Sequence, residues 1–199
     1  MKLYYSPGAC SLSPHIVARE AGIPIELVKV DLKAKKTESG EDFAKVNPKG
    51  YVPALRLDDG SVLTEGPAIV QYLADQKAAS GLAPAAGSKE RYKLAEWLAF
   101  LNSEVHKTWS GLWNPKAERA PVEEKLFQRL EYVNAELKNR PYLMGERFSV
   151  ADAYLFTLLN WGQWTKVDLS RWPSLQQFVE RVKGRPKVQE ALKAEGLLN

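Results

Sequence analysis

Residues 47–69 read NPKGYVPALRLDDGSVLTEGPAI and contain, in order, a loop, a hairpin and the start of a helix. Val52 precedes a proline, which favours an extended backbone at that position. Pro53 then opens a strand, where its missing N–H does least harm to the ladder of hydrogen bonds. The pair Asp59-Gly60 is typical of a tight hairpin turn, so the chain is expected to return as a second strand beside the first.

The return strand leads into Thr64-Glu65-Gly66-Pro67. Pro67 suits the first position of a helix and leaves the preceding backbone N–H groups able to face a ligand. An extended backbone edge next to a helix N-terminus can hold a peptide that carries a carboxylate, because the edge pairs with the main chain and the helix end attracts the charge. The same stretch is equally compatible with a hairpin and a helix that have only a structural role.

The composition is that of an ordinary globular protein. Apolar residues make up 45% and charged residues 26% of the 199 residues, which excludes disordered and collagen-like classes and allows two domains with cores of their own. The net charge of +4 gives little support for nucleic-acid binding. No apolar run is long enough for a membrane span, and the N-terminus lacks the apolar core of a signal peptide, so we expect a cytoplasmic protein.

Cysteine and histidine are scarce, since Cys10 is the only cysteine and His15 and His106 are the only histidines. An intramolecular disulfide and a Cys-x-x-Cys redox pair are therefore excluded. The chain also lacks a convincing cluster of metal-ligating residues, so we expect no metal and no cofactor.

The first 79 residues alternate between strand and helix signals. The expected elements are a strand at Lys2–Tyr5, a helix capped by Ser11 or Ser13 and ended by Gly22, a strand at Ile25–Asp31, a polar loop at Lys33–Gly40, a short helix at Glu41–Val46, the hairpin, and a helix from Pro67 to about Lys77. A parallel first pair of strands, an antiparallel hairpin and packed helices predict a small α/β domain of thioredoxin-like layout over residues 1–79.

Residues 80–88 are rich in Gly, Pro and small side chains and are expected to form a linker. Over residues 89–199, apolar residues recur at spacings of three and four, which predicts a second, all-helical domain. Its expected helices are Lys89–Ser110, a segment from Pro121 that ends before Pro141, a segment opened by a capping box at Ser149 and Asp152, and two segments opened by Pro173 and Pro186.

Cys10 lies just before the first helix, where free N–H groups and the helix dipole favour an anion. We therefore expect a lowered thiol pKa and a functional cysteine at the end of a parallel strand, the usual ligand edge of such sheets. Tyr5 and Ser11 are nearby candidates for hydrogen bonds to a sulfur. A lone inert cysteine is the alternative.

The first helix of the second domain has an apolar stripe, which includes Val105. It also has a second face. Steps of about 100° per residue bring Ala99, Ser103 and His106 together on that face. A small, polar face predicts a cleft or a subunit contact. His106 could there assist proton transfer or merely form a hydrogen bond.

Five motifs in this order resemble the bacterial beta-class glutathione S-transferases, and the likeness covers essentially the whole chain. They are KLYYSPGACSL (2–12), VNPKGYVPAL (46–55), LTEG (63–66), SEVHK (103–107) and FSVADAYLF (148–156). The resemblance implies an N-terminal thioredoxin-like domain, a C-terminal helical-bundle domain and, usually, a homodimer.

The resemblance also implies how glutathione is bound in the first domain. Cys10 would lie beside the glutathione sulfur, and Val52 would pair through its backbone with the tripeptide, followed by a cis Pro53. Glu65 and Gly66 would hold the γ-glutamyl end at the helix N-terminus, and Lys35 would meet the glycyl carboxylate.

From the second domain, the resemblance implies that His106 approaches the sulfur and that Ser103 and Glu104 reach the γ-glutamyl end of glutathione in the neighbouring subunit. Ala99 departs from the family, which often has an amide side chain there, so that contact is expected to be lost or replaced by water. Gly66 replaces a common serine and leaves only a backbone donor.

We therefore expect a glutathione transferase that conjugates the glutathione thiolate to a small apolar electrophile, by positioning and electrostatic stabilisation. The expected catalytic residues are Cys10, His106, Tyr5 and Ser11. Val105 and Trp164 are counted with the substrate-binding residues, and Trp109 and Trp113 are further aromatic candidates for the electrophile pocket.

Two other classes of function remain open. Cys10 could instead form a mixed disulfide with glutathione, which would give a thiol–disulfide or peroxide-reducing enzyme. Alternatively, the fold could serve as a non-enzymatic binding module. The polar residues that the resemblance assigns to glutathione argue against the module, because a protein that no longer bound glutathione would not need them together.

Overall fold

The computed structural model describes residues 1–198. The chain divides into two compact units. The first comprises Met1–Ala83 together with the chain from Arg185 onward, and the second is Pro84–Gly184. The boundary between Ala83 and Pro84 lies within the stretch expected to be a linker.

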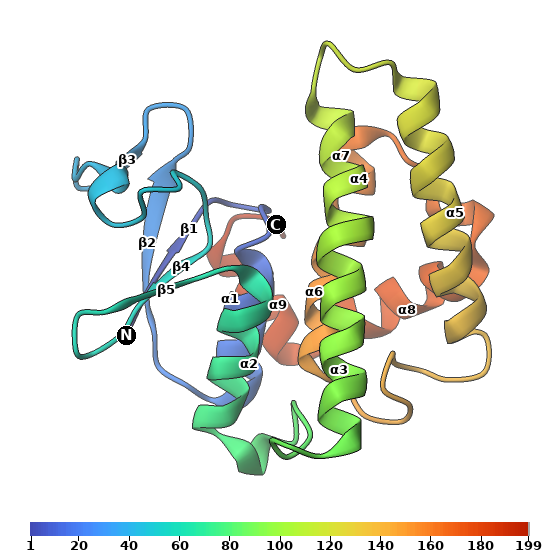
Figure 1. Cartoon of the computed structure of the whole chain (residues 1–199), viewed down its shortest axis with the longest axis horizontal. Coiled ribbons are helices and arrows are strands. Elements are labelled where there is room, and N and C mark those ends of the chain that lie inside the picture. Colours follow the sequence, from blue (N-terminus) through green and yellow to red (C-terminus); the bar gives the residue numbers. More distant parts are fainter. Residues whose placement is uncertain (199) are drawn as a thin grey trace. The chain divides into compact units, whose positions relative to one another are not determined.

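The first unit is built on a mixed sheet with the strand order β3-β2-β1-β4-β5 (Figure 1). The strands are β1 (Lys2–Tyr5), β2 (Glu26–Asp31), β3 (Lys36–Thr37), β4 (Ala54–Arg56) and β5 (Val62–Thr64). Strand β1 runs parallel to β2 and antiparallel to β4, so that Leu3 lies between Leu27 and Leu55. The thioredoxin-like α/β arrangement expected from the sequence is thus confirmed.

The hairpin predicted at Asp59-Gly60 joins β4 to β5. Gly60 has φ +84°, a conformation that residues with a Cβ rarely adopt. The Asp59 carboxylate accepts hydrogen bonds from the N–H and the hydroxyl of Ser61, 2.9 and 2.6 Å away. Local turn chemistry therefore accounts for the register of the two strands.

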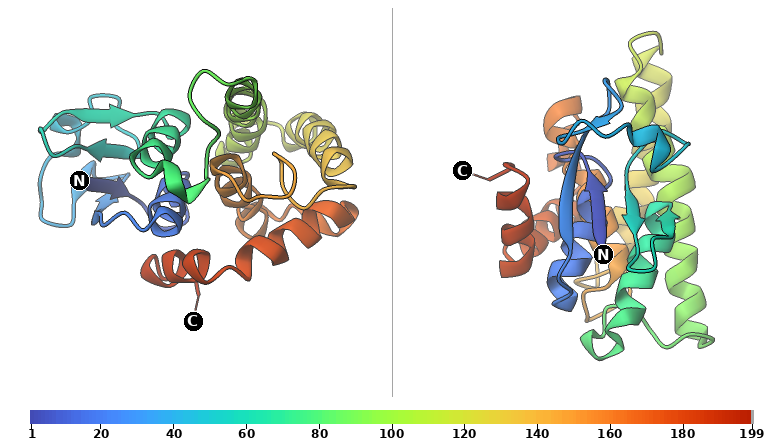
Figure 2. Two further views of the ribbon diagram at one scale, coloured as in Figure 1. Left: turned by 90° about the horizontal axis from the view of Figure 1, so that it is seen from below. Right: turned by 90° about the vertical axis from the view of Figure 1, so that its left-hand side faces the viewer.

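Helices α1 (Leu12–Ala21), α2 (Gly66–Gln76) and α9 (Pro186–Ala194) belong to the first unit, where α1 contacts both α2 and α9 (Figure 1). Figure 2 shows the C-terminal helix beside the blue N-terminal helix. Residues 185–199 were expected in the helical domain, but the chain from Arg185 onward belongs to the first unit. The reason is that α9 buries Val188, Ala191 and Leu192, which gives it an apolar face for α1.

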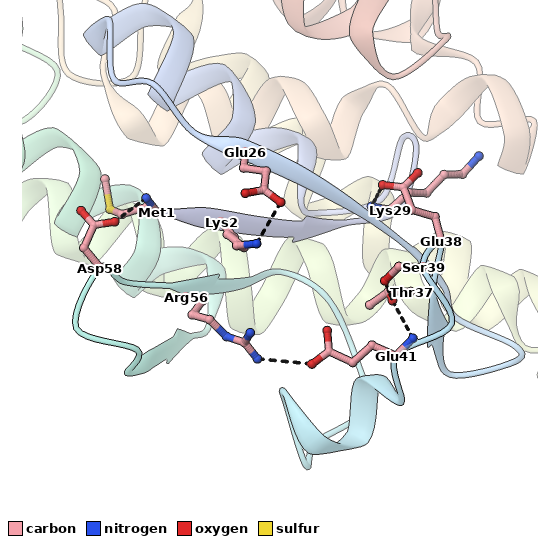
Figure 3. A network of polar contacts seen from close by, with 10 residues as sticks. All are labelled: Met1, Lys2, Glu26, Lys29, Thr37, Glu38, Ser39, Glu41, Arg56 and Asp58. Atoms are coloured by element: carbon pink, nitrogen blue, oxygen red, sulfur yellow. Dashed lines mark hydrogen bonds and ion pairs between the residues drawn. The ribbon is translucent and has the colours of Figure 1, made fainter.

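One face of the sheet carries Tyr4, which packs on Phe43 of a short 3₁₀ helix, η1 (Phe43–Lys45), with ring centroids 5.7 Å apart. Ion pairs between partly exposed side chains lie in the same region of this unit (Figure 3). Lys2 pairs with Glu26 at 3.0 Å and Arg56 with Glu41 at 3.6 Å. Such exposed pairs add little stability, so the apolar contact dominates.

Strand β3 lies in the segment that was expected to be a polar loop, Lys33–Gly40. Thr37 pairs with Val30 and is buried. Its hydroxyl accepts a hydrogen bond from the N–H of Glu41 at 3.0 Å (Figure 3). A strand of two residues is too short to show an alternation of apolar and polar residues, and its buried residue is polar. The sequence therefore did not predict it.

The second unit is helical throughout its described length apart from loops and an isolated bridge. Its α-helices are α3 (Lys89–Phe100), α4 (Lys107–Ser110), α5 (Arg119–Leu137), α6 (Val150–Leu159), α7 (Gly162–Thr165) and α8 (Pro173–Lys183). Short 3₁₀ turns are η2 (Ala78–Ser80, in the first unit), η4 (Gly111–Trp113) and η5 (Leu169–Arg171). Within residues 1–198, no helix is both long and apolar enough to cross a membrane.

Helix α6 starts with the capping box expected at Ser149 and Asp152. The buried Asp152 carboxylate accepts hydrogen bonds from the N–H groups of Leu143 and Ser149 at 2.7 and 2.8 Å and from the Ser149 hydroxyl at 2.7 Å. Burial raises the pKa of Asp152 to about 6, although these donors oppose the shift. The carboxylate thus joins a loop to a helix that is buried along its whole length.

The helix expected at Lys89–Ser110 is interrupted by a π-helical segment, η3 (Leu101–His106). Because a π-helix has a wider turn, the spacing of 100° per residue does not hold through it. Ala99 and Ser103 are exposed, whereas His106 is half-buried. His106 and Asn102 both contact the Tyr154 hydroxyl, so these two side chains lie on the same side of the segment.

Candidate functional site

The loop 47–53 is the centre of the candidate site in the first unit. Asn47, which is buried, holds this loop in place. Its amide nitrogen donates to the carbonyl of Tyr51 at 2.7 Å, and its amide oxygen accepts from the N–H of Lys49 at 3.1 Å. One side chain thus organises the loop from within.

Two residues predicted to bind glutathione contact the backbone of this loop. Lys35 donates from Nζ to the Gly50 carbonyl at 2.6 Å. Cys10 donates from Sγ to the Val52 carbonyl at 3.2 Å. The Val52–Pro53 peptide bond is cis, as the family resemblance implied.

Glu65 contacts the loop through its side chain. Its Oε1 accepts hydrogen bonds from Lys49 Nζ at 2.6 Å and from the Tyr51 hydroxyl at 2.9 Å. These bonds raise the pKa of both Lys49 and Tyr51, since each group keeps its proton more tightly beside a carboxylate. Lys49 and Tyr51 were missed as site residues, although both lie within a quoted family motif.

The backbone of Glu65 is unusual, with φ +69° immediately before α2. Residues with a Cβ rarely adopt such a conformation, and it costs on the order of 1–3 kcal/mol where it occurs. Strain of this kind gathers at ligand-binding positions, where the surrounding structure maintains it. Gly66 follows as the first residue of α2, so its N–H is one of those without a partner inside the helix.

The structure overturns the lowered pKa expected for Cys10. Burial raises the pKa of this thiol to about 12, and the nearby Glu65 carboxylate adds to the rise. The backbone N–H groups of Cys10 and Ser11 act in the expected direction, but their effect is smaller than that of burial. Cys10 is therefore a thiol in the free protein, suited to donating a hydrogen bond.

Ser11 differs from its expected role. Its hydroxyl accepts from the N–H of Ser6 at 3.1 Å and donates to the Ser6 carbonyl at 3.2 Å, so its only hydrogen stays within the loop. It also makes no side-chain cap to α1. Tyr5 lies on β1 with its side chain largely buried, and burial raises its pKa.

A buried glutamate that was not among the expected site residues supports the Cys10 loop. Glu195, after α9, accepts from the N–H of Gly8 at 2.9 Å and from His15 Nδ1 at 2.8 Å. His15 Nε2 accepts from Arg19 Nε at 3.3 Å, which assigns the His15 proton to Nδ1. Because Glu195 is 180 residues from His15 in sequence, no local signal could have revealed the pair.

The site residues predicted in the second unit differ from one another in their burial and in their hydrogen-bond partners. His106 Nδ1 lies 2.6 Å from the Tyr154 hydroxyl. Glu104 accepts hydrogen bonds from Arg129 at 2.9 and 3.2 Å in the same chain. Val105 is fully buried in the core, and Trp164 is 42% exposed.

Among the described residues, no group of three or more His, Cys, Asp or Glu side chains could hold a metal ion.

Family models match both units of the chain. The glutathione S-transferase N-terminal domain matches residues 8–76, and the glutathione S-transferase C-terminal domain matches residues 88–186. The chain belongs to the glutathione S-transferase family.

Individual relatives narrow this assignment. The chain is 48% identical to the glutathione S-transferase GstA of Escherichia coli O157:H7, over 99% of this chain and 100% of the relative. It superimposes on BphK, a bacterial glutathione S-transferase solved as a ternary complex, with a TM-score of 0.97 and 59% identity over 99% and 100% of the two chains. A sphingomonad enzyme solved with glutathione gives a TM-score of 0.95 and 50% identity over 100% of both chains. Bacterial beta-class enzymes are thus its structural neighbours, as the motifs implied.

Proposed function

We propose that this glutathione S-transferase binds glutathione along the loop 47–53 and conjugates its thiolate to small apolar electrophiles. One observation carries the proposal. Lys35, Cys10 and Glu65, three residues expected to bind glutathione, all contact this one loop. The glutathione complex of the sphingomonad relative supports the same ligand.

In the proposed complex, the backbone of Val52 pairs with the tripeptide, and the γ-glutamyl end lies at Glu65 and the N-terminus of α2. Lys35 supplies a positive charge for the glycyl carboxylate. The Cys10 S–H turns from the Val52 carbonyl to the glutathione sulfur and stabilises it as an anion. The sulfur then forms a bond to the electrophile, and the leaving group departs with its electron pair.

Glu65→Gln is expected to weaken glutathione binding about ten- to a hundredfold, in line with a lost hydrogen bond to a charged group. The substitution removes the charge that faces the glutathione amino group and weakens the bonds from Lys49 and Tyr51. Isothermal titration calorimetry with glutathione measures the change directly.

Glu41→Gln is the matched control, because Glu41 is also an exposed, paired glutamate of the first unit. Its affinity for glutathione should equal that of the wild type. Unchanged affinity in Glu65→Gln, together with a lower melting temperature, would assign Glu65 a structural role only.

For the second unit, we propose that His106 hydrogen-bonds the glutathione sulfur and that Trp164 contributes to the electrophile pocket. The support is the family motif at Ser103–Lys107 and the exposure of Trp164. Ser103 and Glu104 are proposed to act across a homodimer. Arg129 holds Glu104 in the described chain, which would orient its carboxylate for such a role.

The dimer is expected to appear in sedimentation velocity at micromolar concentration as a species of about twice 22.3 kDa. Glutathione affinity should fall when dilution separates the subunits, because Ser103 and Glu104 are then lost from each site. A monomer with normal glutathione affinity would refute the proposal that these residues act across subunits.

A further inference from the structure

The second unit contains a groove that plays no part in the function proposed above. One wall is formed by α4 and η4 and the other by the first turns of α5, and these elements contact one another (Figure 1). The groove has a volume of about 310 Å³ and is lined by Lys107, Thr108, Gly111, Pro121, Val122 and Lys125. This volume lies at the lower end of the range for ligand pockets, so it suits a small molecule.

The floor of the groove is apolar. Pro121 and Val122 contribute the ring and the methyl groups of α5. Gly111 lies opposite, and a Cβ at this position would be only 3.1 Å from Val122 Cγ1. The glycine thus lets η4 approach α5 closely, which leaves an apolar surface between the two walls that a ligand can cover.

The rim of the groove is positively charged, because each wall contributes one exposed lysine, Lys107 or Lys125. Within residues 1–198, neither lysine forms an ion pair, whereas Lys93 and Lys187 each pair with a glutamate. Glu124 precedes Lys125 directly and therefore faces another side of α5. Both ammonium groups are thus available to an anion.

Other charges near the groove do not oppose this. Glu104 accepts hydrogen bonds from Arg129 at 2.9 and 3.2 Å, and Glu123 pairs with Arg119 at 2.7 Å. Helix α5 begins beside the groove, and its N-cap residue, Glu118, makes no side-chain cap. The positive end of the helix dipole therefore adds to the charge of the two lysines.

We propose that this groove is a binding site for a small aromatic carboxylate or sulfonate. The aromatic ring covers Val122 and Pro121, the anionic group lies between Lys107 and Lys125, and the Thr108 hydroxyl can donate a hydrogen bond to it. All six lining residues belong to the second unit, so the proposal does not depend on glutathione binding in the first.

The test is isothermal titration calorimetry of the full chain with naphthalene-1-sulfonate. We expect one molecule to bind per chain, with an affinity that falls as salt screens the lysines. Naphthalene-1-sulfonamide has the same ring system without the charge, and it should bind about tenfold more weakly. This pair of ligands separates the contribution of charge from that of the apolar floor.

Variants of the two lysines locate the site. Lys107→Met and Lys125→Met should each weaken sulfonate binding about fivefold, the effect of one exposed charge pair. Lys125→Arg keeps the charge and should retain the wild-type affinity. Lys138→Met is the matched control, because Lys138 is an exposed lysine at the other end of α5, outside the groove. Circular dichroism checks that each variant folds.

The absence of sulfonate binding in the wild type would overturn the proposal. Equal affinities in the wild type, Lys107→Met and Lys125→Met would also overturn it, because the ligand would then bind elsewhere. Titration of the same proteins with glutathione tests the proposed function separately. If the sulfonate binds as expected but glutathione does not, the groove is a binding site and the function proposed above is wrong.

Discussion

At pH 8 and without glutathione, Cys10 is expected to contain about two thousandfold less thiolate than a free cysteine. The reason is that burial raises its pKa to about 12, against about 8.5 for an unperturbed thiol. Its alkylation by iodoacetamide should increase about tenfold per pH unit from pH 8 to pH 11, without the plateau that a free thiol shows near pH 9. Because Cys10 is the only cysteine, intact-mass spectrometry follows the reaction without ambiguity.

The same chain unfolded in urea provides the control, since burial is then lost and the profile should level off near pH 9. Glu65→Gln should move the folded profile only slightly toward lower pH, because the Glu65 charge is a smaller cause than burial. A plateau near pH 7 in the folded protein would show instead that the helix N-terminus controls this thiol.

This expectation also weighs against the redox alternative. A thiol–disulfide enzyme needs an attacking thiolate, which a cysteine with a pKa near 12 does not supply at neutral pH. Hydrogen-bond donation makes no such demand, because the protonated thiol is the donor. Incubation with oxidised glutathione at pH 7 should accordingly leave most of the protein without a mixed disulfide.

Glu195→Ala is expected to lower stability by about 3 kcal/mol or more. The buried carboxylate accepts from Gly8 and from His15, and the loss of an acceptor from a buried donor costs about 1–3 kcal/mol. For a chain of this size, the melting temperature should fall by about 10 °C. Differential scanning calorimetry measures the shift, and Glu195→Gln should give an intermediate value because one acceptor oxygen remains.

Glu190→Ala is the control, and it tests whether the loss of an exposed glutamate from the neighbouring helix α9 lowers the melting temperature in the same way. Glu190 is exposed and pairs with Lys187 on the same helix, so its removal should leave the melting temperature nearly unchanged. If both alanine substitutions lowered the melting temperature equally, the buried hydrogen bonds of Glu195 would not be the cause of the loss of stability.

Features with local chemical causes could be predicted from the sequence. The hairpin at Asp59-Gly60, the capping box at Ser149 and Asp152, and the helix starts at Pro173 and Pro186 are all present. Each depends on neighbours within a few residues, so the sequence contains the whole interaction.

Features that depend on distant contacts or on competing effects could not be predicted. The pKa of Cys10 is set by a competition between a helix N-terminus and burial, and only the first can be read from the sequence. Lys49 and Tyr51 belong to the site because they contact Glu65, and these contacts exist only in the folded chain. Likewise, His106 faces Asn102 because of a π segment for which the spacing of apolar residues gave no signal.

The first unit is discontinuous in sequence, and this has a consequence for how it is made. A ribosome synthesises the sheet, α1 and α2 early, but the acceptor for Gly8 and His15 comes 187 and 180 residues later. During most of translation, the thiol-bearing loop therefore lacks a partner that it has in the finished protein. The unit that is synthesised first is thus completed last, so a stop codon before residue 195 should damage the beginning of the protein as well as its end.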